Sequence, residues 1–179
     1  MELWNKNDTS STYYYNDGYY TGDGNKGYFD EANIRGWKIG SAGAHDNHSG
    51  TWGTENDYRL AVLATAKTKT SIYEALQNRR FFTTLDKNLT LSFELNEAQM
   101  GAVISAGTYN AVITAGDANS EIFSEIKLYK NGTALYTWNP NSANPGITQS
   151  LTTSGGDYYY VKVTQADGNE AISSPIYIQ

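Results

Sequence analysis

The chain has only two histidines, and both lie in the segment His45-Asp46-Asn47-His48, which Gly43 and Gly50 flank. Imidazole and carboxylate groups are common ligands of divalent transition metals. In an extended segment, alternate side chains point to the same side, so Asp46 and His48 can present an oxygen and a nitrogen to one site. The spacing therefore indicates a metal-binding loop. The alternative is a solvated polar turn in which Asp and Asn cap backbone amides.

The number of ligands limits what this loop can do alone. A catalytic zinc uses three protein ligands, and a binuclear centre uses more. The chain has no cysteine and no further histidine, so thiolate sites, disulfides and cysteine nucleophiles are excluded. A metal at Asp46 and His48 would need ligands from outside this sequence.

The segments around the loop have an α/β pattern. Apolar and polar residues alternate over 33–40, which predicts a short strand, and the small residues of 41–44 predict a turn. The apolar run 59–64 predicts a buried strand. An S-x-x-E capping box that begins at Ser71 predicts a helix near 71–80. The histidine loop would then follow a strand, where α/β proteins place their functional residues.

From residue 89 onward, the sequence alternates without helical signals. Strands are expected over 89–95, 109–114, 125–130, 133–138, 158–163 and 174–178. Asn131-Gly132 is a strong hairpin signal between two of them. These six expected strands, close to the seven of an immunoglobulin domain, predict an immunoglobulin-like antiparallel β-sandwich over 89–179, with a boundary near 86–88. The fold class is therefore mainly β, with a partial α/β segment over 1–88.

Composition excludes some classes of function. The net charge is −6, from 13 basic and 19 acidic residues, and no basic stretch interrupts it, so nucleic-acid binding is not expected. No apolar run reaches the roughly 18 residues of a membrane helix. Residues 8–28, rich in Tyr, Gly and small polar residues, predict a loop.

Several segments resemble the C-terminal part of the PHP (polymerase and histidinol phosphatase) metallohydrolases, and most of all the CehA/McbA-like branch. These segments are Glu2–Asn5, Gly36–Gly40, Asp46–His48 with Trp52-Gly53, Ile72–Arg80, Asp86–Asn88 and Ser173–Tyr177. The resemblance implies that 1–88 is the end of a catalytic βα barrel, and that 89–179 is the sandwich that often follows it.

The resemblance also implies a site and a reaction. Members of this family hydrolyse phosphoesters with two or three divalent ions, such as zinc, manganese or iron, and their last motif is Asp-x-His. Asp46 and His48 match that motif, and His45 is a candidate to orient a ligand. The family's earlier ligands, including a His-x-His motif, would precede Glu2. We therefore expect an exported bacterial protein, secreted or on the cell surface with its signal upstream, of which this segment alone is inactive.

A non-enzymatic module is the alternative. Trp138 and the polar loop 139–146 could form a carbohydrate site for a cell-surface glycan, because flat aromatic rings stack on sugar faces. Attachment to a surface or docking to a partner would also suit a β-sandwich.

Three arginines are a further candidate feature. Arg59, Arg79 and Arg80 carry forked donors that can bind phosphate oxygens. The simpler expectation is that they are solvated, or paired with Asp57 and Glu74.

Overall fold

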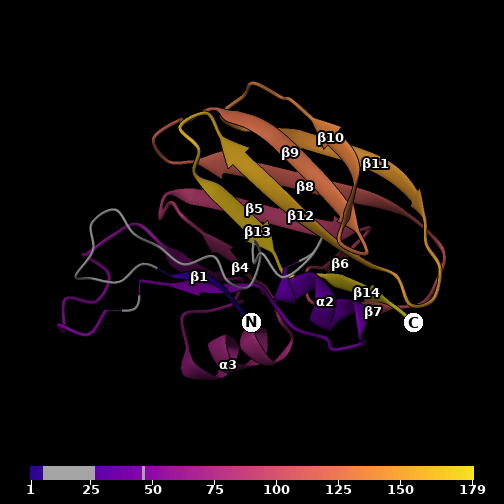
Figure 1. Cartoon of the computed structure of the whole chain (residues 1–179), viewed down its shortest axis with the longest axis horizontal. Helices are drawn as coiled ribbons and strands as arrows, with labels where there is room; N and C mark the ends of the chain where they lie inside the picture. The colour runs from indigo at the N-terminus through magenta and orange to yellow at the C-terminus, as the bar shows by residue number, and fades with distance from the viewer. Residues whose placement is uncertain (6–26, 46) are drawn as a thin grey trace.

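The computed structural model describes residues 1–5, 27–45 and 47–179, and almost all of the loop expected over 8–28 lies outside this part. The described chain is mainly β, with extensive antiparallel sheets, which confirms a β-rich fold (Figure 1). None of the helices that the structure describes is long and apolar enough to cross a membrane.

One sheet of the sandwich has four strands in the order β11-β8-β5-β6, and all are paired antiparallel. Its strands are β5 (Leu89–Leu95), β6 (Ala98–Gln99), β8 (Thr108–Asp117) and β11 (Gly146–Thr152). Strand β5 alternates between buried and less buried residues, so one face of this sheet packs into the interior.

The other sheet has eight strands and extends across the expected boundary near 86–88. Its main path is β10-β9-β12-β13-β4-β3. Strand β14 also pairs with β12, and β7 pairs with β14. The strands are β3 (Arg59–Val62), β4 (Phe81–Thr84), β7 (Val103–Ile104), β9 (Phe123–Lys130), β10 (Thr133–Trp138), β12 (Tyr158–Gln165), β13 (Glu170–Ser173) and β14 (Ile176–Ile178). Because β4 pairs with β13, hydrogen bonds join the first 88 residues to the sandwich.

Strand β12 lies between two hydrophobic clusters, which explains why it is buried along nearly its whole length. Tyr159, Val161 and Val163 contribute to the main core between the two sheets. Tyr158 and Tyr160 point to the opposite face, where they join a second cluster that includes residues of the N-terminal segment. Because successive side chains of a strand point to opposite faces, β12 contributes residues to both cores.

The N-terminal segment contains a parallel strand pair. Strand β1 (Glu2–Asn5) pairs with β2 (Ala42–Ala44), and helix α2 (Tyr28–Ile34) lies between them in the sequence. The strand predicted over 33–40 is therefore wrong, because its first residues end α2, and the predicted turn over 41–44 is instead β2. The N-cap of helix α2 is Gly27, which has no side chain to cap the helix, so the sequence lacks the usual start signal.

Helix α3 (Lys69–Gln77) matches the predicted helix near 71–80, but it begins earlier. Thr68 is the N-cap, and its side chain accepts a hydrogen bond from the Ser71 amide. The expected capping box of Ser71 and Glu74 is therefore wrong, because Ser71 lies inside the helix. Ala75 is the buried residue of this helix.

Two other predictions can be compared with the strands. Strand β3 confirms the strand expected from residue 59, but it is half-buried at the edge of the sheet rather than buried. The Asn131-Gly132 hairpin is confirmed, since both residues have positive φ, at 51° and 74°, as a type I′ turn requires.

Candidate metal-binding loop after strand β2

Strand β2 leads directly into the predicted metal-binding loop and is fixed against the rest of the fold. The Ser41 hydroxyl donates to the Ile172 carbonyl at 2.7 Å, and its amide donates to the Ser174 hydroxyl at 3.2 Å. At Gly43, a Cβ atom would lie 2.1 Å from Thr83 Oγ1, so only glycine lets β2 approach β4 this closely. The loop therefore starts from a rigid support.

The structure places the two histidines differently. His45 is half-buried, whereas His48 is exposed, and Asp46 lies outside the described residues. His45 lines a hollow of about 360 Å³. The other lining residues are Gly43, Ala44, Asn47, Trp52, Tyr58, Arg59 and Leu60. Of the two imidazoles, His45 is thus the one that borders a defined hollow.

Asn47 organises the second half of the loop. Its Oδ1 accepts from the Gly50 amide at 3.0 Å, and its Nδ2 donates to Thr51 Oγ1 at 2.9 Å. The Trp52 indole nitrogen donates to the Asn47 carbonyl at 3.3 Å. This is the backbone-capping role expected of Asn in a polar turn.

The described residues of the loop do not complete a metal site. Three ligand side chains within bonding reach of one ion occur in the described residues only at Asp86, Asp117 and Glu121, away from this loop. His45 and His48 alone are fewer than the three protein ligands that a catalytic zinc uses. An ion at this loop would need Asp46 and further ligands.

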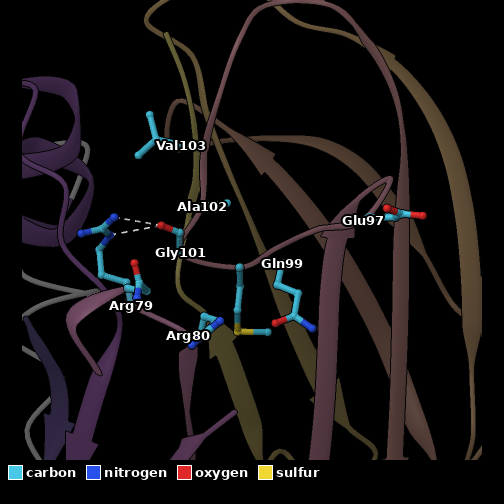
Figure 2. A pocket seen from close by; sticks show the side chains of 9 residues that line it. Arg79, Arg80, Glu97, Gln99, Gly101, Ala102 and Val103 are labelled. Atoms are coloured by element: carbon cyan, nitrogen blue, oxygen red, sulfur yellow. Dashed lines mark hydrogen bonds between the residues drawn. The ribbon is translucent and has the colours of Figure 1, made fainter. Parts of the chain in front are cut away.

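Arg79 and Arg80 border a separate hollow of about 410 Å³ (Figure 2). Arg79 donates to the Gly101 carbonyl from Nε at 3.3 Å and from Nη2 at 3.0 Å, and its guanidinium lies 5.8 Å from the centre of the Tyr177 ring. Arg80 forms an ion pair with Glu74 at 2.6 Å, as expected from the sequence. Both arginines therefore link α3 and its exit to neighbouring structure.

The Arg59 side chain donates hydrogen bonds to backbone oxygens of the loop that precedes β3. Its guanidinium donates to the carbonyls of Gly53, Asn56 and Tyr58 at 2.7 to 2.8 Å. The expected pairing with Asp57 is wrong, because Asp57 pairs with Lys87 at 2.7 Å. Arg59 stabilises the wall of the His45 hollow through these bonds.

Trp138, the candidate carbohydrate residue, is half-buried at the end of β10. Its ring stacks on Tyr136 with centroids 5.6 Å apart and planes 21° apart, and both rings pack against the main core. These contacts give Trp138 a structural role at the edge of the sheet.

A third group of polar residues was not anticipated from the sequence. The side-chain nitrogen of Gln165 donates to one oxygen each of Asp86, Asp117 and Glu121, at 3.4, 3.2 and 3.1 Å. These residues come from the β4–β5 connection, the end of β8, the β8–β9 loop and the end of β12. Because they are dispersed in the sequence, no local motif reveals them.

Comparisons with known proteins provide relatives without an assigned function. No protein-family model matches the chain. An uncharacterised protein of Chlamydia pneumoniae is 30% identical over 136 residues, which cover 66% of this chain and 22% of that protein. An uncharacterised protein of Chlamydia muridarum is 29% identical with the same coverage. The chain thus spans about a fifth of the length of the curated relatives it matches.

Among solved structures, an engineered protein matches 50% of this chain and 20% of its own length, with 12% identity and a TM-score of 0.34. That score is too low to establish a shared fold.

Proposed function

We propose that this chain is the C-terminal segment of an exported PHP-like, metal-dependent phosphoesterase and is inactive by itself. In the full-length protein, Asp46 and His48 would serve as the last pair of metal ligands. The remaining ligands would come from an upstream part of the catalytic domain, and the sandwich would follow that domain as a rigid C-terminal module.

The position of the loop carries the proposal. Strands β1 and β2 are parallel, and α2 lies between them in sequence, as in a βαβ unit. The His45–His48 segment follows the carboxyl end of β2, which is the end where α/β barrels place ligands and catalytic groups. The parallel pair forms a separate two-stranded sheet beside the two larger, mainly antiparallel sheets, which is consistent with an origin in a larger parallel sheet.

The curated relatives give a second, weaker support. Each is several times longer than the segment it shares with this chain, since the match covers 22% of its length. A longer protein has room for the additional ligands that this loop lacks. The relatives have no assigned activity, so they do not identify a substrate.

The test is an activity measurement on the full-length protein, purified with added Zn²⁺, Mn²⁺ or Fe²⁺. We expect hydrolysis of p-nitrophenyl phosphate or bis-p-nitrophenyl phosphate that a chelator abolishes. Asp46→Asn and His48→Ala should each lower kcat by about a hundredfold or more, because each removes a ligand. The isolated chain of 179 residues should show no turnover.

Asp57→Asn is the matched control, because Asp57 is an exposed carboxylate near the same loop that pairs only with Lys87 in the contacts described. It should retain full activity. Metal-dependent activity that survives both Asp46→Asn and His48→Ala would refute the ligand assignment. Absence of phosphoesterase activity from the metal-loaded protein, on monoesters and diesters alike, would refute the enzyme class.

The second candidate is a non-enzymatic sandwich module that binds carbohydrate. It is favoured by the Tyr136–Trp138 stack, which forms a partly exposed aromatic surface on β10 at the edge of the larger sheet. Binding to a glycan array that Trp138→Ala abolishes, while Trp52→Ala leaves it intact, would support this function. Equal binding by both variants would reject the Trp138 site.

A further inference from the structure

We propose that Asp86, Asp117, Glu121 and Gln165 form a calcium-binding site at one end of the sandwich. The ends of β8 and β12, which carry Asp117 and Gln165, lie at the same end of the fold (Figure 1). This site is separate from the His45–His48 loop and does not depend on the proposed phosphoesterase function.

The carboxylates converge on one point. One oxygen of each of the three acidic side chains lies 3.1 to 3.4 Å from Gln165 Nε2. These ligand atoms are all within 4.8 Å of one another. Calcium binds oxygen at about 2.3–2.6 Å, so a single ion can bridge oxygens at this separation.

The charge of the group is not neutralised by a basic side chain. Among the ion pairs that the structure describes, none joins a Lys or Arg to Asp86, Asp117 or Glu121. Asp86 is buried and the other two are half-buried. Removing like charges from water without a counter-charge is unfavourable. A divalent cation would supply the missing positive charge.

The pKa values show where this repulsion acts. Burial and the charges of Asp167, Asp86 and Asp117 raise the pKa of Glu121 above its ordinary value. Burial also acts to raise the pKa of Asp117, but hydrogen bonds from the Glu121 and Asn119 amides outweigh it and lower that pKa. The neighbouring carboxylates therefore oppose the ionisation of Glu121.

Gln165 supplies an independent observation. Its side chain is only 1% exposed and points into the acidic group through Nε2, yet its buried Oε1 has no hydrogen-bond partner. A buried amide oxygen without a partner is unfavourable, and rotation of the amide exchanges its oxygen and nitrogen positions. With a cation present, that rotation would place Oε1 beside the carboxylate oxygens as a fourth oxygen ligand.

The ligand chemistry favours calcium over other metals. All four side chains offer oxygen, which hard cations prefer, whereas zinc and copper sites typically include nitrogen or sulfur. Calcium also tolerates irregular ligand geometry, which suits side chains from separate loops, while Mg²⁺ demands a near-octahedral set. Backbone carbonyls and water would complete the coordination.

A bound ion would join the segment before the sandwich to the sandwich itself. Asp86 follows β4, whereas Asp117 and Gln165 end strands of the two different sheets. Calcium would thus connect the β4–β5 junction to both sheets, and its effect should appear as stability of the whole fold.

Calcium titration of the isolated chain by calorimetry, together with thermal unfolding, tests this site. We expect one saturable site and a rise of roughly 5–10 °C in Tm at a Ca²⁺ concentration about one hundred times Kd. Glu121→Gln should abolish this rise, although its metal-free Tm should be equal to or above that of the wild type, because it removes repulsion. Gln165→Met should weaken calcium binding by about tenfold or more.

Glu97→Gln, which alters an exposed carboxylate elsewhere on the sandwich, should preserve the full response. If Glu121→Gln does not fold, Asp117→Asn provides the same comparison. The proposal is overturned by no binding up to about 10 mM Ca²⁺, by an unchanged response in the Glu121 and Asp117 variants, or by an equal response to Mg²⁺.

Discussion

The Tyr158 hydroxyl, on strand β12 of the sandwich, donates a hydrogen bond at 3.1 Å to the buried carboxylate of Asp30 on helix α2. Tyr160, on the same face of β12, donates to the other oxygen of Asp30 at 3.1 Å. Residues 128 positions apart are thereby joined beside the second hydrophobic cluster, to which both tyrosines belong. This contact attaches the N-terminal segment to the sandwich.

Loss of these two hydroxyls should loosen that attachment. Tyr158→Phe should lower the free energy of unfolding by about 1–2 kcal/mol, and the double change with Tyr160→Phe by about 3 kcal/mol, because Asp30 loses two donors in a buried position. Urea unfolding measures this loss. Tyr73→Phe, at an exposed position, should be neutral. Wild-type stability in the double variant would contradict the role of Asp30 as the shared acceptor.

The same cluster predicts sensitivity to alkaline pH. Burial raises the pKa of Tyr158 and of Tyr177, and the charge of Asp30 raises that of Tyr158 further. Above the ordinary phenol pKa of about 10, the unfolded chain loses these protons before the folded chain does, so stability should fall as pH rises. Tm measured from pH 8 to 12 should fall less steeply in Tyr158→Phe with Tyr177→Phe. Identical pH profiles would refute this explanation.

The pKa of Asp157 predicts that the stability of the fold decreases at acidic pH as well. Burial acts to raise its pKa, but hydrogen bonds from Lys130, the Ser154 amide and Asn131 outweigh burial and lower the pKa. A lowered carboxyl pKa stabilises the fold above about pH 4, and this contribution is lost as pH falls through the folded-state value.

Asp157→Asn should therefore lower the free energy of unfolding by about 2 kcal/mol at pH 7 and by much less near pH 2. Denaturant unfolding at both pH values provides the comparison. An equal difference at the two pH values would show that the carboxylate charge is unimportant.

The close approach of β2 to β4 requires glycine at position 43. Gly43→Ala would place a methyl group 2.1 Å from Thr83 Oγ1 and 2.9 Å from the Trp4 ring, so neighbouring atoms would have to move. We expect a loss of about 2 kcal/mol in unfolding free energy. Gly146→Ala is the matched control, because a Cβ there meets nothing within 4 Å. Equal stability of the two variants would contradict the close approach.

Local sequence signals predicted those elements whose geometry is set by neighbouring residues. Strand β5 coincides with the predicted 89–95 because its alternation reflects one buried face. The Asn131-Gly132 turn was predictable because these residues tolerate the positive φ that a type I′ hairpin requires.

Elements fixed by distant contacts could not be predicted in this way. Helix α2 has no capping side chain, and its buried Asp30 and Asn33 bind hydroxyl groups of Tyr158 and Tyr177, which lie far away in the sequence. Strand β13, with four residues, is too short to give a clear alternation, although it joins β12 to β4.

The same difference between local signals and distant contacts applies to the two candidate sites. The His45–His48 segment could be found because its residues are contiguous. The Asp86–Asp117–Glu121–Gln165 group could not, because folding alone brings together four residues from separate segments.

The metal content of the full-length protein tests the central claim most directly. Elemental analysis after purification in zinc or manganese should find bound metal in the wild type, and at least one fewer ion per chain in the Asp46→Ala, His48→Ala double variant. Metal content that is the same in both proteins, or absent from both, would contradict a ligand role for this loop.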